Sequence, residues 1–152
     1  MGRLCLLLAA VIGISFVYSQ SCPKYWFGFD GYCYRYFTAL NSWRAAQDIC
    51  ATYGANLASI HGDEENSFIH KLQGSCLNNI FWIGLSDEEN EGDFRWIDGT
   101  ELVYSNWNPG EPDNYLDQDC VVFGGTTGEA PWKWNDTFCS DNHHFVCKWL
   151  LP

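Results

Sequence analysis

Residues 80–85, Ile80-Phe81-Trp82-Ile83-Gly84-Leu85, mark the point at which this sequence changes from helical to extended patterning. Before them, apolar residues recur at helical spacing over residues 41–53 and 63–73, and a glycine directly follows each segment. After them come short apolar or alternating runs separated by Gly, Asp, Asn and Pro, which are typical of antiparallel strands. Two helices followed by strands predict an α+β domain. The runs are residues 80–85, 93–97, 120–124, 132–134 and 144–150.

The two helical segments carry recognisable start and stop signals. Asn41 or Ser42 caps the first, whose predicted inward face comprises Trp43, Ala46, Ile49, Cys50 and Tyr53. In the second, acidic residues occupy the first turn, where they suit the helix dipole. Its predicted inward residues are Phe68, Ile69 and Leu72.

Length and composition fit one folded domain behind a signal peptide. The chain has 152 residues, of which 47% are hydrophobic and 17% aromatic, unlike a disordered chain. Arg3 precedes an apolar run that ends in Val17-Tyr18-Ser19, so residues 1–19 are predicted to be a secretory signal peptide. The alternative, a membrane anchor, requires roughly 20 apolar residues. We therefore expect a single domain over residues 20–152, secreted into an oxidising, extracellular compartment and not inserted in a membrane.

The net charge argues against nucleic acid as a partner. Eight basic residues against 19 acidic ones give a formal charge of −11. When Arg3 leaves with the signal peptide, seven against 19 give −12. Such a chain repels polyphosphate and attracts cations.

The cysteine count predicts disulfides. Seven cysteines remain once Cys5 leaves with the signal peptide, which in an oxidising compartment implies three intrachain disulfides and one thiol that is free or bonded to another chain. A zinc site is the competing interpretation, but there is no C-x-x-C pair and the four histidines are scattered.

Residues 107–114, WNPGEPDN, hold too many turn formers for a helix or a strand, and they place Glu111 and Asp113 on either side of a proline. Farther along, Asp119, Asn135 and Asp136 offer further oxygen atoms. Calcium takes about 6 to 8 oxygens from carboxylates, amide carbonyls and water, so this composition predicts a Ca²⁺ site. The alternative is a solvated acidic loop.

Several short motifs follow one another along the chain: Cys22 and Cys33, residues 43–50, residues 54–60 (GANLASI), residues 82–85 (WIGL), residues 107–113, Asp119-Cys120, Trp134-Asn135-Asp136, Cys139 and Phe145-Val146-Cys147. Taken in this order, they resemble the C-type lectin domain, and the likeness covers essentially the whole of residues 20–152. The resemblance implies two helices, two small antiparallel sheets and a long calcium-binding loop region.

The resemblance also implies a disulfide pattern. Cys76 lies outside the family pattern, and we hypothesise that it forms an interchain bond that makes a covalent homodimer; the alternative is a buried or capped free thiol. The implied intrachain pairs are Cys22–Cys33, Cys50–Cys147 and Cys120–Cys139.

The resemblance also implies a main calcium site, in which the peptide bond before Pro112 is cis. The family's usual triplets are E-P-N and Q-P-D, with a glutamate where this chain has Gln118. Here the triplet is the hybrid Glu111-Pro112-Asp113, which still keeps two acids and two amides facing the sugar. The implied calcium ligands are Glu111, Asp113, Gln118, Asn135 and Asp136.

In such a site two neighbouring sugar hydroxyls ligate Ca²⁺ and hydrogen-bond to the carboxylates and amides. E-P-N members prefer mannose-type sugars and Q-P-D members galactose-type ones, so Glu111 and Asp113 indicate different sugars. Tyr115 stands where galactose-binding relatives often carry a ring that stacks on the sugar, which favours galactose; packing within the loop is its alternative role. The implied sugar-binding residues are Glu111, Asp113, Tyr115, Gln118, Asn135 and Asp136.

An auxiliary calcium site is implied at Asp87, Glu91, Asn114 and Asp119, where the alternative is a solvated acidic turn. The chain's N-x-S/T sequon is Asn135-Asp136-Thr137. A glycan there would abolish the main site, and we expect the shielded Asn135 not to be modified.

The resemblance, together with the predicted signal peptide, implies a secreted, calcium-dependent lectin that binds glycans, including microbial surface sugars, in innate immune recognition or agglutination. An enzyme is disfavoured, because the histidines have no recognisable nucleophile partner and the paired acids are better explained by calcium. The alternative is a C-type-lectin-like protein whose ligand is a mineral, ice or another protein, since function does not follow from fold.

Overall fold

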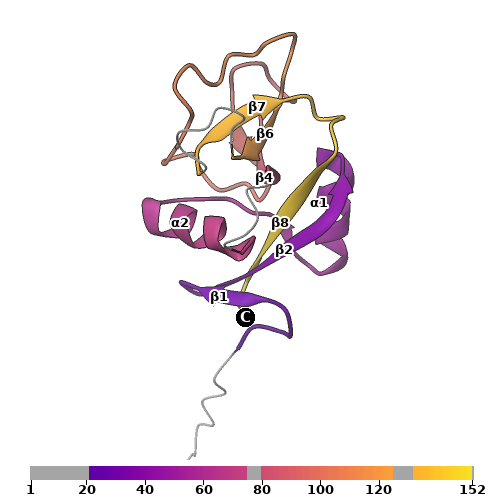
Figure 1. Cartoon of the computed structure of the whole chain (residues 1–152), viewed down its shortest axis with the longest axis vertical. Coiled ribbons are helices and arrows are strands. Elements are labelled where there is room, and N and C mark those ends of the chain that lie inside the picture. Colours follow the sequence, from indigo (N-terminus) through magenta and orange to yellow (C-terminus); the bar gives the residue numbers. More distant parts are fainter. Residues whose placement is uncertain (1–20, 75–79, 125–131, 152) are drawn as a thin grey trace, which may run out of the picture.

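The computed structural model describes residues 21–74, 80–124 and 132–151, so the predicted signal peptide and Cys76 lie outside the described residues. Two helices and eight strands are assigned within them (Figure 1). In chain order they are β1 Phe27–Phe29, β2 Tyr32–Asn41, α1 Trp43–Thr52, β3 Asn56–Leu57, α2 Asp63–Leu72, β4 Phe81–Ser86, β5 Arg95–Trp96, β6 Cys120–Phe123, β7 Trp134–Thr137 and β8 His143–Leu150.

The strands form one continuous sheet in the order β1-β2-β8-β4-β6-β7, with β3 paired to β8 and β5 paired to β4. All pairs are antiparallel except β4 with β8, where Phe81 lies opposite His144 and Trp82 opposite Phe145. The two small antiparallel sheets that the resemblance implies correspond to β1-β2-β8 and β4-β6-β7, and they form one continuous sheet through this pairing. The short parallel pairing joins the lower strands β1, β2 and β8 to the upper strands β4, β6 and β7 (Figure 1).

Both predicted helices are present. The Ser42 hydroxyl caps α1 by accepting from the Ala45 amide at 3.4 Å, and Trp43, Ala46 and Cys50 are buried. Three acidic residues occupy the first turn of α2, as the dipole favours. The inward face of α2 is less apolar than its sequence suggests, because Glu65 and Asn66 are buried beside Ile69.

The order of elements was predicted incompletely. The ten-residue β2 and the short β1 precede α1, so strands do not simply follow helices. The aromatic and β-branched residues of β2 suit a strand, but both of its faces carry apolar residues and the two-residue alternation is lost. The 132–134 run contributes only Trp134 to a strand.

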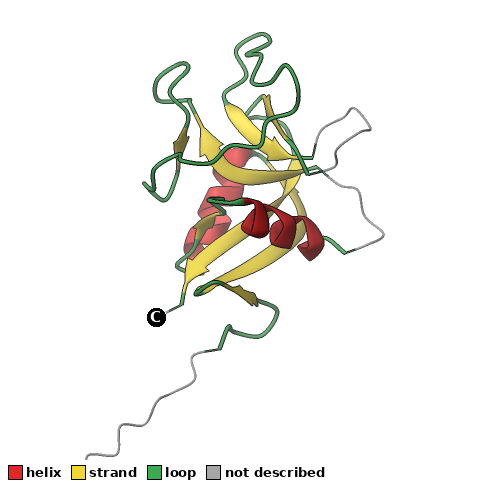
Figure 2. Cartoon of the chain, turned by 90° about the vertical axis from the view of Figure 1, so that its left-hand side faces the viewer, coloured by secondary structure: helices red, strands yellow, loops and turns green. Residues whose placement is uncertain are grey.

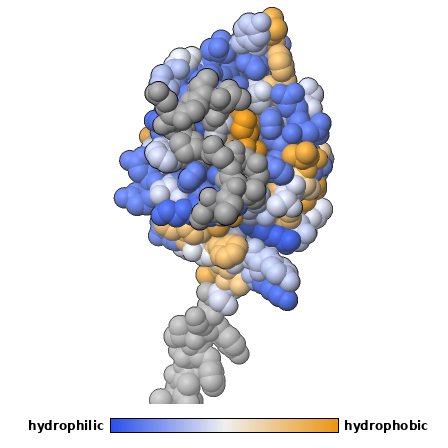
Figure 3. Space-filling view, in the orientation of Figure 1, coloured by the Kyte–Doolittle hydropathy of each residue, from blue (hydrophilic) through white to orange (hydrophobic). Residues whose placement is uncertain are grey.

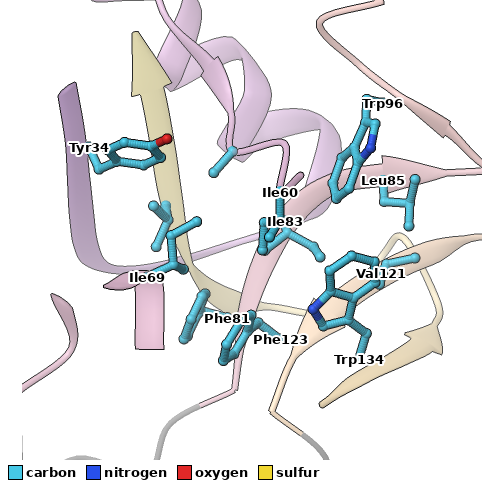
Figure 4. Close-up of a cluster of buried hydrophobic side chains, with 12 residues drawn as sticks. Tyr34, Ile60, Ile69, Phe81, Ile83, Leu85, Trp96, Val121, Phe123 and Trp134 are labelled. Atoms are coloured by element: carbon cyan, nitrogen blue, oxygen red, sulfur yellow. The ribbon is translucent and has the colours of Figure 1, made fainter. Parts of the chain in front are cut away.

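Two clusters of buried side chains form the core. Figure 4 shows the first, in which residues of β4 and β6 meet Tyr34, Trp96 and Trp134. The second lies under α1 and contains Trp43 and Trp82. The strand patterns of the sequence predict that Trp82, Trp96, Trp107 and Trp134 are core residues. Three of them are buried, with exposed fractions of 0%, 2% and 0% for Trp82, Trp96 and Trp134, whereas Trp107 is only partly buried and packs against the first cluster. The face seen in Figure 3 is mainly hydrophilic with scattered apolar residues.

Three disulfides crosslink these elements, and all three pairings that the resemblance implies are confirmed. Cys22–Cys33 ties the N-terminal segment to β2, and Cys50–Cys147 ties α1 to β8. Cys120–Cys139 joins the start of β6 to the turn after β7. None of the helices described here is long and apolar enough to cross a bilayer.

A buried ion pair connects α2 to β8. Lys148 Nζ donates to Glu65 Oε1 at 2.7 Å, with 4% and 10% of the two side chains exposed. The Tyr34 hydroxyl donates to the same carboxylate at 2.5 Å, and burial followed by this contact raises the pKa of Tyr34. Removing one partner of such a pair costs about 3–5 kcal/mol, because a buried charge is left unpaired.

Gly84 generates a prediction about stability. A Cβ at this position would lie 2.5 Å from the Leu57 carbonyl oxygen and 2.8 Å from Ile97, so the β3 segment could not pass over β4. We expect Gly84→Ala to lower the free energy of unfolding, measured by chemical denaturation, by about 1–3 kcal/mol. Gly62→Ala is the control, since its Cβ would meet only a flexible Glu64 oxygen at 3.8 Å, and should cost less than about 1 kcal/mol. Equal losses would contradict the prediction.

Candidate functional site

The long segment 97–119 between β5 and β6, at the end of the molecule far from the C-terminus, carries Glu111, Asp113 and Asp119 (Figures 1 and 2). The other predicted acidic ligands are Asp136 on β7 and Asp87 and Glu91 between β4 and β5. The backbone amide of Asn108 donates to the backbone carbonyl of Trp134 at 2.9 Å. The Trp107 ring packs edge-on against the Trp134 ring, with centroids 5.8 Å apart. These contacts hold the loop beside β7.

Three carboxylates meet at this junction. One oxygen each of Glu111, Asp113 and Asp136 lies within 4.8 Å of the other two. Asp136, on β7, is 4% exposed, and its two oxygens accept from the backbone amides of Asp113 at 3.2 Å and Asn114 at 2.7 Å. The Glu111–Pro112 peptide is cis, as the resemblance implies.

Amide side chains border the same cluster. Asn135 Nδ2 donates to Glu111 Oε1 at 3.1 Å, and Asn135 Oδ1 accepts from Asn108 Nδ2. The cluster opens into a hollow of about 380 Å³ that Gln118 and Tyr115 also line, and the Tyr115 side chain is 63% exposed. The hollow therefore brings together all six residues that the resemblance assigns to sugar binding.

The crowding of negative charge alters the protonation of Glu111. Burial raises the pKa of this carboxyl to about 7, with a hydrogen bond and charge repulsion from Asp136 and repulsion from Asp113 adding to the effect. A divalent cation would replace this repulsion with attraction. A donor set made only of oxygens, with like charges pressed together, therefore fits calcium.

A second acidic cluster lies in the same part of the molecule. One oxygen each of Glu91, Asp117 and Asp119 lies within 4.8 Å of the other two. Desolvation and the charges of neighbouring carboxylates, Asp87 among them, raise the pKa of both Glu91 and Asp119. The predicted ligands Glu91 and Asp119 are thus brought together, with Asp117 as an addition.

The other two residues predicted for this cluster are connected to it. Asn114 Nδ2 donates to Glu91 Oε1 at 2.8 Å. Asp87 is 2% exposed; its Oδ2 accepts from the Gly92 amide at 2.8 Å, while its Oδ1 has no hydrogen-bond partner within residues 21–74, 80–124 and 132–151. A buried carboxylate oxygen without a donor is costly, and a cation is one group that satisfies it.

Sequence reasoning missed two residues at this end of the molecule. Asp117 joins the second cluster because the chain turns sharply before it, with φ of 56° at Leu116 and 72° at Asp117. Asn108 holds Asn135 in place from the loop side. The only available signals were the spacing Asp117-x-Asp119 and the position of Asn108 directly after Trp107.

The family model for the lectin C-type domain matches residues 39–149 of this chain. The chain belongs to the C-type lectin domain family. The match runs from the end of β2 to the end of β8 and includes both acidic clusters.

Relatives show the same affiliation. This C-type lectin domain is 35% identical over 130 residues to "C-type lectin domain family 17, member A" of Homo sapiens, covering 84% of this chain and 32% of that protein. It therefore spans about a third of the length of the curated relatives it matches.

Solved structures superpose on this domain over most of its length. The carbohydrate-recognition domain of cow CD23, determined in the presence of a GlcNAc2Man3 oligosaccharide, superposes with a TM-score of 0.76 at 37% identity, covering 88% of this chain and 98% of that one. The herring type II antifreeze protein superposes with a TM-score of 0.79 at 32% identity, covering 86% of this chain and 100% of that one.

The pKa of Glu111 leads to a test on the calcium-free lectin domain. We expect its side-chain carboxyl to titrate near pH 7, far above the ordinary value of about 4.3, when followed by carbon NMR in a chelating buffer. Asp136→Asn should lower the midpoint, because it removes the closest negative charge. Asp141→Asn should leave the midpoint unchanged, because the Asp141 carboxylate is hydrogen-bonded to Thr137. A wild-type midpoint below about 5 would contradict the prediction.

Proposed function

We propose that this domain is a calcium-dependent carbohydrate-binding protein whose site is the hollow around Glu111, Asp113 and Asp136. One observation carries the proposal: three carboxylates from a loop and a strand converge, with two amides beside them, on one open hollow. Three larger hollows, two of about 600 Å³ and one of about 510 Å³, lie elsewhere among the described residues, but none of them is lined by these acids.

The carboxylates and amides of the hollow would divide the work of binding. Glu111, Asp113 and Asp136 supply the negative charge that holds Ca²⁺, and Asn135 and Gln118 supply amide oxygens and NH2 groups. A bound ion offers open coordination positions to two neighbouring hydroxyls of a sugar. Those hydroxyls donate hydrogen bonds to carboxylates and accept them from amides, which makes their geometry selective. No bond of the sugar is broken.

The second cluster would hold an auxiliary Ca²⁺. Glu91, Asp117 and Asp119 supply oxygens, and the buried Oδ1 of Asp87 needs a positive partner. Asn114 links the clusters, because its side chain bonds Glu91 while its backbone amide bonds Asp136. Occupation of the second cluster would therefore steady the loop that forms the first.

A galactose-type sugar is the proposed preference. The exposed Tyr115 ring at the rim of the hollow can stack on the apolar face of such a sugar. We further propose that the protein is secreted and recognises microbial surface glycans, and that an interchain Cys76 bond would raise avidity by pairing two sites.

Ice is the competing ligand, and the likeness to the herring antifreeze protein is the observation that favours it. Mineral or protein ligands have no comparable support. Ice binding would be detected as thermal hysteresis, and a lectin without antifreeze activity should show none.

The decisive experiment is a glycan array probed with the secreted protein in millimolar calcium and again with chelator. We expect binding to terminal galactose or N-acetylgalactosamine with calcium and none with chelator. Glu111→Gln should reduce binding strongly, while the charge-matched control Glu101→Gln, outside both clusters, should not. Binding that survives chelation would place the glycan site elsewhere, and thermal hysteresis without glycan binding would favour ice.

A double substitution tests how the hybrid triplet sets the sugar preference. Asp113→Asn with Gln118→Glu keeps the number of acids but restores the mannose-type pattern. We expect the array signal to move from galactose-terminated to mannose-terminated glycans, with calcium dependence unchanged. Asp113→Asn alone lowers the number of acids and should weaken calcium affinity. An unchanged sugar preference in the double variant would show that these two positions do not select the sugar.

A further inference from the structure

A groove of about 510 Å³ lies between α2 and the start of β7, away from both acidic clusters. It is bordered by Asp63, His70 and Lys71 from α2 and by Trp132 and Lys133 from the segment that enters β7. It shares no lining residue with the hollow at Glu111. The proposed calcium site does not involve any of these side chains.

The groove contains a tryptophan that the core does not use. Trp132 is 46% exposed, whereas Trp82, Trp96 and Trp134 are buried. Its ring stands at 81° to the His70 ring, with centroids 5.6 Å apart. The pKa of His70 is lowered by burial and then by the charge of Lys71, which favours the neutral form of its ring.

The side chains of two asparagines fix the backbone at Trp132. The Trp132 carbonyl accepts from Asn66 Nδ2 at 3.1 Å and from Asn106 Nδ2 at 2.9 Å. Asn66 is 3% exposed, and its other amide atom accepts from Trp134 Nε1 at 2.9 Å. The backbone under Trp132 is thus tied to the core before any ligand arrives, which reduces the entropy lost on binding.

The groove also gathers positive charge in an acidic chain. Arg44, Arg95 and Lys148 are each paired with a carboxylate. Lys133 Nζ donates instead to the neutral Asn106 Oδ1 at 2.6 Å, and neither Lys133 nor Lys71 forms an ion pair with another residue of the described ranges.

Among the residues that the structure describes, one acid lines the groove together with these two lysines. Asp63 lines the groove, and its Oδ1 already accepts from the Tyr104 hydroxyl at 2.8 Å. Two cations against one hydrogen-bonded carboxylate give the described lining of the groove a net positive charge, while the chain as a whole carries −11. A ligand with a negative group is therefore favoured here and repelled elsewhere.

We propose that this groove is a second, calcium-independent site for an acidic saccharide, with a sugar ring stacked on Trp132 and its carboxylate or sulfate between Lys71 and Lys133. The flat apolar face of a pyranose matches an exposed indole, and charge-assisted hydrogen bonds from two ammonium groups select an anion. A neutral sugar would leave the lysines unused, and an acidic peptide would leave the indole without a ring to stack on.

The test is an isothermal titration of the intact secreted protein with a chondroitin sulfate tetrasaccharide in chelator, where the main site is inactive. A hyaluronan tetrasaccharide, which has carboxylates without sulfates, identifies the anion, and chitotetraose serves as the neutral comparison. We expect the acidic tetrasaccharides to bind and chitotetraose not to bind. Trp132→Ala should weaken binding about tenfold, and Lys71→Gln with Lys133→Gln by about tenfold or more.

Controls separate this site from general charge effects and from the calcium site. Arg95→Gln removes one exposed cation from another part of the surface, and Asp136→Asn disables the main site; neither should weaken binding in chelator. Absence of binding by a folded protein would overturn the proposal. So would an equal loss in Arg95→Gln, equal binding of chitotetraose, or equal binding of a polyglutamate peptide. None of these outcomes depends on whether the Glu111 hollow binds sugar.

Discussion

Strand β8 joins the two ends of the molecule, because it is hydrogen-bonded to β2, β3 and β4 at once. Its Cys147 is bonded to α1, and its Lys148 forms the buried ion pair with α2. Both helices and the lower strands are therefore anchored on one eight-residue segment. Among the described strands, the upper group pairs with β8 through the short parallel contact of β4, and this contact helps to set the position of the acidic end.

From β4 the order continues through β6 to β7, and this places Asp136 opposite the 107–114 loop. Like charges would separate in a flexible loop, because repulsion between carboxylates favours distance. Here the tryptophan contact of residues 107 and 134 and the Cys120–Cys139 disulfide hold the two sides together. Burial, and then the hydrogen bond and charge of Asp136 and the charge of Asp113, raise the pKa of Glu111 in this arrangement.

Local patterns predicted the local features well. The caps, periods and glycines of α1 and α2 depend on neighbouring residues, so the chain itself displays them. Strand β2 escaped this reasoning because both of its faces are partly apolar, which hides the alternation. The burial of Glu65 was also hidden, since its partner Lys148 lies 83 residues away. Contacts between distant residues cannot be read from spacing.

The sequence by itself determined the types of elements, the set of cysteines and the oxygen-rich chemistry of the loop, because these follow from residue identity and short-range order. Only the tertiary structure decided which carboxylates meet, and that Asp117 joins Glu91 and Asp119. It also decided that two lysines with no ion pair among the described residues share a groove with an exposed tryptophan. Those outcomes depend on the pairing of β6 with β7 and on where α2 packs. Electrostatic fields arise from distances in space, and only the folded chain sets them.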